Sequence, residues 1–406
     1  MIGSGPPSIL IVSQNVPLPA RLRTWQQARA LARQGWKVRV ICPRRAGQCR
    51  RETICDIRID RFGQPVEGAS RLGLLVEYLL ALATISVHLF VARLRERIDV
   101  VQVVNPPDWL IVPALFLRYS GAYLVFDMTD LSIALFEAKF GRQRGFLYNV
   151  VALLNRTALR VPDLVITSSE VYRRIAIRVG KRTPGSTLTV HTYLEKLSSA
   201  QGTREAGALR IGYFGVLGSH DGVDLLIHAV ALMQSKRFPE FECVVVGDGP
   251  ALPSLLQLCR TLKVEKRMRF LGFLDGAARD AAVASFDIAV ITDPVNRYTR
   301  ALCMNKAFVY AAHGLAIVST PLAGTKRLLG SAAAYAESDT PEALADAIGV
   351  LLLDNDKREV LARTVRSRAE TNFDWTAEAL KYVTAIDALV ATRDRVKVGR
   401  TDASFG

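Results

Sequence analysis

The feature of this sequence that most constrains its fold is a repeated alternation of short apolar runs with helical segments. Residues 9–13 read ILIVS, residues 24–35 form a predicted helix that stops at Gly35, and residues 37–43 read KVRVICP. Further strands of this half are predicted at 99–104, 122–127 and 163–168. Continuous β-branched runs without polar alternation are typical of strands buried on both faces, as in a parallel sheet. The first half is therefore predicted to be a doubly wound α/β domain.

A second series of the same kind follows a polar, helix-poor stretch at 198–207, which is predicted to be a linker. Its strands are expected at 209–215, 242–249, 267–273, 286–292 and 315–320, and its helices at 223–233, at 251–262 and from Asn305. At 406 residues the chain has room for two domains. We place them at 1–197 and 208–375, followed by a helix at 376–393 that crosses back to the first domain and a frayed tail at 394–406.

Composition narrows the class of protein. Half of the residues are hydrophobic and 22% are charged, which is typical of a folded, core-forming chain. The six cysteines form no Cys-x-x-Cys pair and no cluster with histidine, so we expect neither a disulfide framework nor structural zinc, and a reducing compartment fits better. The apolar run at 9–12 is too short for a signal peptide, and its basic flank follows it.

The formal net charge of +15 is distributed unevenly. Residues 1–195 contain 27 Lys and Arg against 14 Asp and Glu, whereas the remainder contains 26 against 24. Such an asymmetry suggests that the first half meets an anionic surface, whether nucleic acid, anionic lipid or a phosphorylated substrate. A basic surface that serves only solubility is the alternative, and composition alone does not separate the two.

The segment 72–98 is nearly apolar enough and long enough to span a bilayer. Polar residues along it recur every seven or four positions and so share one helical stripe; they are Ser70, Glu77, Thr84 and His88. The segment ends in three arginines, Arg93, Arg95 and Arg97. This is not a spanning pattern. It predicts a helix that packs in the core or lies in a membrane interface; we favour core packing, with which partial membrane contact is compatible.

Several strand-to-helix turns carry residues suited to binding phosphate. The strands of an open parallel sheet lead to helix N-termini, whose unpaired N–H groups and dipole favour anions. The first such turn, GYFGVLGSHDG, contains four glycines. Gly247 and Gly249 lie in the next turn, and Asn305 and Lys306 begin a later helix. Tight turns also need glycine without any ligand, so each cluster alone is a weak signal. A dinucleotide fingerprint is absent, because Leu252 stands where its third glycine would fall, and this disfavours a dehydrogenase.

Taken together, the ordered blocks resemble the glycosyltransferases of family 4, which are retaining enzymes of the GT-B fold. In the second half the matching blocks are GYFGVLGSHDGVDLLIHA, VVVGDGP, RMRFLGFL, FDIAVIT and MNKAFVYAAHGLAIVST, with Phe-Asp-Trp before the last helix. In the first half they are PLPARLRTWQQARALARQGWKVRVICP, NPPD, FDMTDLSIALFEAKF and DLVITSSEVYRRIAIRVG. The resemblance extends to about residue 390 and implies two Rossmann-like domains that face each other across a cleft.

The resemblance also implies roles for residues at matching positions. A nucleotide-sugar donor would be held by Gly215, Gly218, His220, Gly247, Gly249, Gly272, Phe273, Arg297, Arg300, Asn305 and Lys306. The acceptor side would use Arg21, Arg23, Asn105 and Asp108, with Asp127 and Asp130 as candidate catalytic residues. No metal ion or cofactor would be needed, because helix ends and cations would stabilise the departing diphosphate. Among the other histidines, His313 is expected to serve a helix C-terminus, and His88 and His228 to be structural.

The sequence departs from the family pattern at several motif positions. Val309 and Ala301 stand where relatives carry acids, and Thr129 stands where they carry histidine. The changed positions also include Ala20, Leu22, His191, Thr192, Val216 and Asp221. Charged hydrogen-bond partners of the ribose and phosphates are thereby lost, each worth about 1.5–3 kcal/mol.

Two hypotheses therefore stay open. In the first, the chain transfers a sugar from a nucleotide donor to a saccharide or lipid-linked acceptor in surface polysaccharide or glycoconjugate assembly, with relocated cations. In the second, it is a catalytically inactive binding or activating partner of another glycosyltransferase. Nucleic-acid binding is disfavoured, because no recognised module is present. A lipid-linked acceptor would explain the basic first half and place the chain in the cytoplasm, on the inner face of the plasma membrane.

Overall fold

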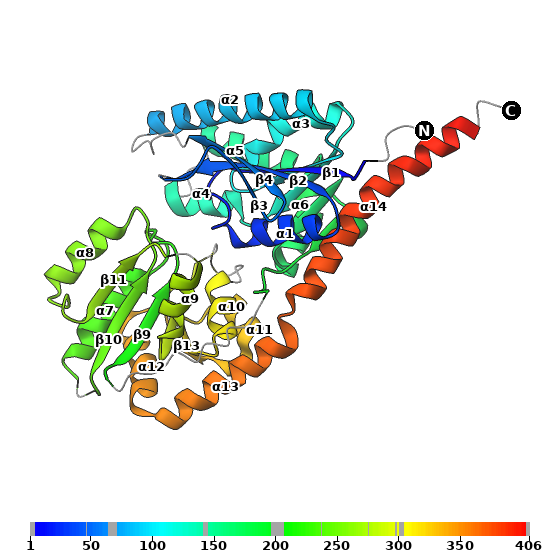
Figure 1. Cartoon of the computed structure of the whole chain (residues 1–406). Helices are drawn as coiled ribbons and strands as arrows, with labels where there is room; N and C mark the ends of the chain where they lie inside the picture. Colours follow the sequence, from blue (N-terminus) through cyan, green and yellow to red (C-terminus); the bar gives the residue numbers. More distant parts are fainter. Residues whose placement is uncertain are drawn as a thin grey trace. The chain divides into compact units, whose positions relative to one another are not determined.

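The computed structural model in Figure 1 describes residues 5–45, 47–63, 71–140, 145–195, 207–236, 238–274, 276–296, 299 and 304–402. The side chains of residues 71–78, 138–140 and 392–402 are not included in that description. The chain divides into two compact units. Unit 1 comprises Met1–Thr192 and Thr376–Gly406, and unit 2 comprises Tyr193–Trp375. The predicted linker at 198–207 lies almost wholly outside the described residues.

Unit 1 is built on an eight-stranded sheet with the order β3-β4-β2-β1-β5-β6-β7-β8. Its strands are β1 (Ser8–Ser13), β2 (Lys37–Arg44), β3 (Arg51–Ile54), β4 (Ile57–Gly63), β5 (Val100–Val104), β6 (Tyr123–Met128), β7 (Leu164–Thr167) and β8 (Thr187–Thr189). All neighbouring pairs are parallel except β3 and β4. The central strands β1 and β5 are buried along their whole length, as their apolar runs predict.

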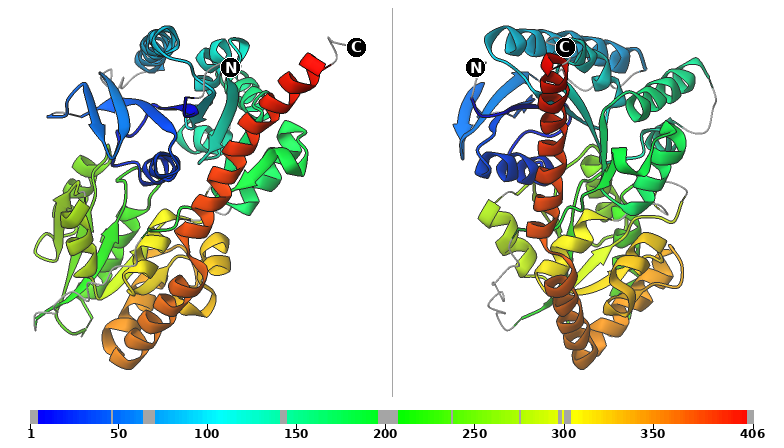
Figure 2. Two further views of the ribbon diagram at one scale, coloured as in Figure 1. Left: turned by 45° about the vertical axis from the view of Figure 1, so that its right-hand side comes forward. Right: turned by 90° about the vertical axis from the view of Figure 1, so that its right-hand side faces the viewer.

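Helices cover both faces of this sheet. They are α1 (Leu22–Arg33), α2 (Arg71–Arg95), α3 (Ile111–Tyr119), α4 (Ser132–Phe140), α5 (Phe146–Arg160), α6 (Glu170–Gly180) and the last helix α14 (Trp375–Asp402), with 3-10 turns η1 (Asp108–Leu110) and η2 (Pro184–Ser186). The left view of Figure 2 shows α1 and α2 nearly end-on, on opposite faces of the sheet. None of the helices in the described part of the chain is long and apolar enough to cross a membrane.

The antiparallel strand β3 is not anticipated by the sequence pattern. It pairs with β4 through a two-residue turn made by Cys55 and Asp56, which have φ angles of 49° and 62°. A two-residue hairpin turn of this kind needs positive φ at both positions and is usually marked by Asn-Gly or Asp-Gly. Cys-Asp carries no such signal, so the hairpin is visible only in the structure.

The last helix differs from its predicted end. Residues 394–406 were expected to form a frayed tail, but α14 continues to Asp402. Residues 394–402 contain no proline and a single glycine, so nothing in them forces a helix to stop. Within unit 1, α14 is tied to the sheet because the hydroxyl of Tyr382 donates to Oε1 of Gln102 at 2.7 Å.

Unit 2 contains a six-stranded parallel sheet with the order β11-β10-β9-β12-β13-β14. Its strands are β9 (Leu209–Phe214), β10 (Phe241–Val246), β11 (Met268–Gly272), β12 (Ile288–Ile291), β13 (Ala316–Ser319) and β14 (Ala334–Tyr335). Its helices are α7 (Val223–Gln234), α8 (Leu252–Thr261), α9 (Gly276–Ala284), α10 (Asn305–Ala312), α11 (Ala323–Leu329), α12 (Pro341–Leu353) and α13 (Asn355–Asn372). Apolar side chains of β9, β10, α7 and α12 share one buried core. The predicted fold of two parallel-sheet α/β domains is confirmed.

Candidate functional site

In unit 1, polar residues gather where the strand order changes direction. The chain leaves β1 toward β2 on one side and returns to β5 on the other, and ligands of open α/β sheets bind at such a switch point, beyond the carboxyl ends of the strands. Arg21 spans this point. Its Nη1 donates to Oγ of Ser13 at the end of β1 (3.0 Å), and its Nη2 donates to the carbonyl of Asn105 just after β5 (2.7 Å).

Asn105 connects two loops at the same edge. Its side-chain oxygen accepts the backbone N–H groups of Thr129 (2.6 Å) and Asp130 (3.2 Å), both of which follow β6. Its amide nitrogen donates to Oδ1 of Asp108 at 3.0 Å and to the carbonyl of Asp130 at 2.9 Å. Burial raises the pKa of Asp108, although hydrogen bonds from Asn105, Asn155 and Ser132 oppose that shift. The predicted acceptor-side residues are thus brought together.

Asp127 lies beneath this layer and is not suited to the catalytic role expected of it. Its carboxylate is 0% exposed and is held in a bidentate ion pair by Arg23, with the shortest N–O distance at 2.8 Å. Gln27 donates to its other oxygen at 3.0 Å. A carboxylate with both oxygens engaged and no solvent access cannot reach a substrate. We therefore reassign Asp127 and Arg23 as positioning residues, while Asp130 stays partly exposed at the surface of the cluster.

The changed motif at 191–192 also belongs to the framework of unit 1. The backbone N–H of His191 donates to Glu378 at 2.8 Å, and its ring nitrogen Nδ1 lies 3.2 Å from the same carboxylate. Burial would raise the pKa of Glu378, but the hydrogen bonds from His191 and Lys381 outweigh it and lower the pKa. Thr192 accepts a hydrogen bond from Arg23 at 3.2 Å. His191 thus anchors the first turn of α14, and Thr192 contacts α1.

In unit 2, the loops after β9 and β10 touch backbone to backbone. A Cβ atom on Gly247 would lie 1.8 Å from the carbonyl oxygen of Gly215, and one on Gly249 would lie 2.5 Å from that of Leu217. The N–H of Leu217 also donates to the carbonyl of Asp248 at 3.1 Å. Gly247 and Gly249 are therefore required by loop packing itself, and they hold the β9 loop rigid at the carboxyl edge of the sheet.

Asp221 occupies part of the predicted phosphate loop. Its Oδ2 accepts the backbone N–H of Gly218 at 2.9 Å, and a Cβ on Gly218 would lie 2.7 Å from that oxygen. Burial raises the pKa of Asp221, and the charges of Lys306 and His220 oppose the shift. An anion placed at Gly218 would therefore compete with a carboxylate already bonded there.

Lys306 lies at the switch point of unit 2, between β9 and β12. Its ammonium Nζ is 2.8 Å from Oδ2 of Asp293 and 3.2 Å from the hydroxyl of Tyr213, and it also lies 4.5 Å from the centre of the Tyr213 ring. Burial alone would lower the pKa of Lys306, but Asp293 and the neighbouring groups raise it above its usual value. Lys306 is only 8% exposed, so its charge is matched internally.

Helix α10 begins at Asn305, whose side chain is exposed, after Met304, which makes no capping hydrogen bond. Val309, at the position where an acid was expected, is 8% exposed within unit 2. The expected role of His313 at the helix C-terminus is confirmed, because its Nδ1 lies 2.9 Å from the carbonyl oxygen of Val309. Burial lowers the pKa of His313.

The remaining predicted donor residues divide into two groups. Gly272 ends β11 with φ at 70°, and the exposed Phe273 follows it at the same edge of the sheet as the β9 loop. Arg297 and Arg300, predicted as counter-charges, lie outside the described residues, as does Ala301. Their predicted roles stay predictions.

Three residues at these two switch points were missed by sequence reasoning. Asp293 and Tyr213 surround Lys306, and a polar residue directly after the β12 run was the available signal for Asp293. In unit 1, Gln14 follows β1 and is 6% exposed, and its Oε1 has no hydrogen-bond partner among the described residues. A buried amide oxygen without a partner is costly, and an ordered water or a bound ligand would supply the missing donor.

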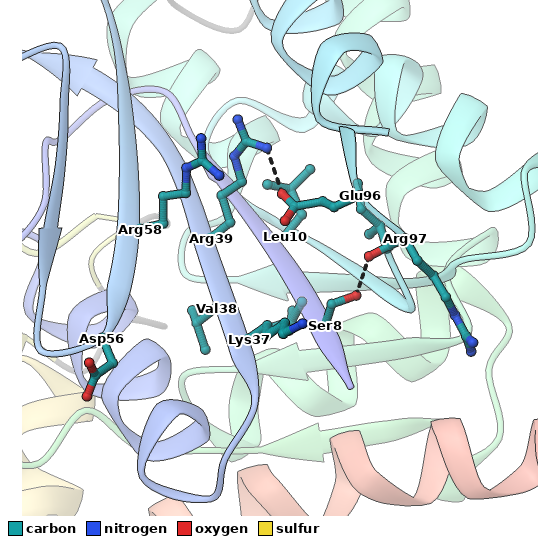
Figure 3. A pocket seen from close by; sticks show the side chains of 11 residues that line it. Ser8, Leu10, Lys37, Val38, Arg39, Asp56, Arg58, Glu96 and Arg97 are labelled. Atoms are coloured by element: carbon teal, nitrogen blue, oxygen red, sulfur yellow. Dashed lines mark hydrogen bonds and ion pairs between the residues drawn. The ribbon is translucent and has the colours of Figure 1, made fainter. Parts of the chain in front are cut away.

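A cavity of about 190 Å³ lies elsewhere in unit 1, at the amino ends of its strands. Figure 3 shows its lining, where Arg39 reaches Glu96 and Ser8 donates to the carbonyl of Arg97. Ser8 and Lys37 begin β1 and β2, so the cavity is at the sheet edge opposite to Arg21 and Asn105. Among the described residues, no three His, Cys, Asp or Glu side chains gather as a metal-ligand set.

Comparison with solved structures identifies the fold. Sucrose-phosphate synthase from Thermosynechococcus elongatus superposes with a TM-score of 0.75 at 17% identity, covering 95% of this chain and 100% of that chain. WaaG, a glycosyltransferase involved in lipopolysaccharide biosynthesis, gives 0.69 at 17% identity, with 93% and 98% covered. Anabaena HepE in complex with UDP-glucose gives 0.67 at 17% identity, with 94% and 99% covered. The chain has the GT-B fold.

Sequence comparison supplies the family. Residues 20–191 match the glycosyl transferase 4-like domain, and residues 208–354 match the glycosyl transferases group 1. The D-inositol 3-phosphate glycosyltransferase of Corynebacterium urealyticum is 25% identical over 249 residues, which cover 58% of this chain and 56% of that protein. The chain thus aligns with about half the length of this relative. It belongs to the family 4-like glycosyltransferases.

Proposed function

We propose that the chain is a retaining glycosyltransferase that moves a sugar from a nucleotide-sugar donor to a saccharide or lipid-linked acceptor in polysaccharide or glycoconjugate assembly. One observation carries this proposal. Each unit has a buried polar cluster at the switch point of its own parallel sheet, around Arg21 and Asn105 in one unit and around Lys306 and Asp293 in the other. The switch point is where open α/β sheets bind ligands.

In this proposal unit 2 binds the donor. The rigid β9 loop and the N-terminus of α10 would present backbone N–H groups to the diphosphate, which a helix dipole also favours. The charge of the leaving group would be stabilised by these fixed dipoles, without a metal ion. Lys306 would act indirectly, because its ion pair with Asp293 orders the β12 loop beside the site.

Unit 1 would bind the acceptor. Arg21 and Asp130 lie at the surface of the Asn105 network and offer a cation and a carboxylate to acceptor hydroxyl or phosphate groups. The orphan oxygen of Gln14 supports the same assignment, since an acceptor hydroxyl would satisfy it. A lipid-linked acceptor would bring the chain to the cytoplasm-facing surface of an anionic membrane, and the surplus of positive charge in residues 1–195 supports this location.

A second candidate function is that of a catalytically inactive partner of another glycosyltransferase. Three observations favour it: Val309 is buried where an acid is expected, Asp221 occupies the N–H of Gly218, and the charge of Lys306 is matched by Asp293. Each reduces the attraction for a diphosphate. The scaffold would then serve binding or activation.

The test is a thermal-shift screen of the purified chain with UDP-, GDP-, ADP- and TDP-sugars, followed by donor hydrolysis. UDP-glucose is the first donor to try, because HepE was solved with it. Stabilisation by one donor together with turnover supports the transferase. Stabilisation without turnover, or no response to any donor combined with co-purification of a second transferase, supports the inactive partner instead.

A further inference from the structure

Helix α2 presents two opposite apolar faces. One face contains Ala81, Ile85, Leu89 and Ala92, which are at most 1% exposed and recur every three or four residues. This spacing forms a single stripe that packs against the rest of unit 1. Thr84 and His88 lie beside that stripe, half-buried, and Nδ1 of His88 is 2.8 Å from the carbonyl oxygen of Thr84. Packing within unit 1 thus fully explains the inner face.

The outer face of α2 has no such explanation. Leu80, Ala83, Val87, Phe90 and Leu94 also recur every three or four residues, on the side opposite to the buried stripe. The large members are 54%, 60%, 49% and 70% exposed. From residue 80 to residue 94 this outer stripe runs for about 20 Å at 1.5 Å per residue. Surface helices of globular proteins usually carry polar residues on this side.

Helix α3 continues the outer stripe. Val112, Phe116 and Tyr119 recur at the same spacing and are 44%, 44% and 84% exposed. The rings of Phe90 and Phe116 lie 5.8 Å apart, so the two helices share one surface. Figure 1 shows α2 and α3 on the same side of the sheet. We name this surface the α2–α3 face; it consists of Leu79, Leu80, Val87, Phe90, Leu94, Val112, Phe116 and Tyr119.

The charged side chains that the described parts of α2 and α3 contribute around the α2–α3 face are all positive, and the one acid paired with them is Asp163, which binds Arg118 of α3 at 3.0 Å. Arg93 and Arg95 flank the outer stripe on its two sides, and neither has an acidic partner among the described residues. The described side chains of α2, from residue 79 on, and those of α3 include no acid. An apolar stripe with arginines along its edges matches a helix that lies in the interface of an anionic bilayer.

We propose that the α2–α3 face lies in the headgroup region of an anionic bilayer, with Val87, Phe90 and Leu94 inserted among the acyl chains. A second copy of the chain suits this face less well. A two-fold dimer would place the same arginines of both copies around one interface, in the half that carries the surplus of positive charge. The inference rests on the proposed function in one respect, because membrane binding would give the chain access to a lipid-linked acceptor. Binding to the membrane can nevertheless be measured without donor or acceptor.

The experiment uses the full chain with phosphatidylcholine vesicles containing 0% or 30% phosphatidylglycerol, and measures co-flotation. We expect binding only with phosphatidylglycerol. The combined variant Val87→Ser, Phe90→Ser and Leu94→Ser should weaken it at least tenfold. The matched control Leu353→Ser, Val360→Ser and Leu380→Ser, at exposed apolar residues outside the face, should bind as the parent does. Circular dichroism and thermal unfolding verify that both variants fold.

A charge variant, Arg93→Gln with Arg95→Gln, should weaken binding and reduce its dependence on salt. Two results would overturn the proposal: vesicle binding that survives the triple serine variant, or a dimer in solution that the same variant dissociates, which would make a second copy the occupant. Donor hydrolysis is measured in parallel. Vesicle binding without hydrolysis would leave this inference intact and overturn the proposed function. Hydrolysis without vesicle binding would overturn this inference and leave the proposed function intact.

Discussion

The ammonium group of Lys306 lies 2.8 Å from the carboxylate of Asp293, and both side chains are at least nine-tenths buried. The lysine opens α10 and the aspartate follows β12, so the ion pair joins the two elements that border the switch point of unit 2. A lysine that sequence reasoning assigns to the ligand is thus neutralised within the protein. Lys306 would therefore contribute to a donor site by ordering the β12 loop through its ion pair with Asp293, and not by contacting the donor.

This relationship predicts a non-additive effect on stability. Lys306→Met and Asp293→Leu should each destabilise unit 2 by about 3–5 kcal/mol, because each leaves one buried charge unpaired. The double variant should recover most of that loss, as measured by thermal or urea unfolding. Donor affinity in the double variant should stay within about threefold of the parent, or about 0.7 kcal/mol. A much larger loss of affinity would mean that Lys306 contacts the donor directly.

Asp221→Asn should strengthen donor binding. Asparagine can still accept the N–H of Gly218 but removes the negative charge from the loop that would hold the diphosphate. We expect the Kd for the donor to fall about tenfold, or about 1.4 kcal/mol, by calorimetry at pH 7.5. The control is Asp224→Asn, which removes an exposed charge from the first turn of α7. If Asp221→Asn weakens binding, the carboxylate itself holds the ligand.

Asp127→Asn tests the buried ion pair of unit 1. The change leaves the guanidinium of Arg23 buried without its counter-charge, at a cost of about 3–5 kcal/mol. For a unit of this size the unfolding temperature should fall on the order of 10 °C. Glu170→Gln, in a more exposed pair with Arg173, should change stability by less than about 1 kcal/mol. Equal effects of the two substitutions would refute the positioning role of Asp127.

Gly249→Ala tests the contact between the two loops of unit 2. The new methyl group would lie 2.5 Å from the carbonyl oxygen of Leu217, so the β9 loop must move. We expect both a lower unfolding temperature and a donor Kd raised about tenfold. Gly185→Ala, where nothing lies within 4 Å, serves as the control. A stability loss with unchanged donor affinity would show that the β9 loop does not bind the donor.

The stability of unit 2 should depend on pH because of His313. Burial lowers its pKa in the folded state, the carbonyl of Val309 and Asp280 oppose the shift, and Arg279 and Arg366 add to it. The unfolded chain therefore takes up the proton first. The contribution of His313 to the free energy of unfolding should be fully present above about pH 6.5, the ordinary pKa of histidine. It should be lost as the pH falls from there toward the lower pKa that His313 has in the folded state.

The measurement for His313 is the unfolding temperature from pH 8 to pH 5. His313→Gln keeps a donor for the Val309 carbonyl but cannot be protonated, so its unfolding temperature should decline less over this range than that of the parent. The comparison with the parent cancels the titration of the other histidines. Parallel curves for the two proteins would contradict the assignment.

Much of the fold is predictable from the sequence because the strands are marked locally. The runs that correspond to β1, β5 and β10 are mostly apolar and rich in β-branched residues, interrupted only by Gln102 in β5 and Glu242 in β10, and this pattern is sufficient to predict strands buried on both faces. The hairpin between β3 and β4 was missed because Cys55 and Asp56 adopt positive φ without the usual glycine. The structure extends α14 to Asp402, beyond the predicted helix end at residue 393, because no proline follows there to stop the helix.

The candidate site was predictable only in part. Asn105 and Asp130 could be placed at one sheet edge from their position after apolar strands, since the carboxyl ends of parallel strands meet there. The burial of Asp127 by Arg23 and Gln27 could not be predicted, because helix α1 is about a hundred positions away along the chain. The exposure of the outer stripe of α2 could not be predicted either, because the inner and outer faces of this helix are both apolar in sequence.

The two parallel sheets, their glycine turns and the polar residues at their strand ends follow from local sequence patterns, because periodicity and turn chemistry act between neighbours along the chain. Which of those residues remain available to a ligand depends on tertiary contacts. Lys306 is neutralised because β12 lies next to β9 and brings Asp293 to it, and Gly218 is engaged because the loop folds Asp221 back onto its N–H group. Burial and pairing of charge depend on contacts between distant segments, which local sequence patterns do not encode.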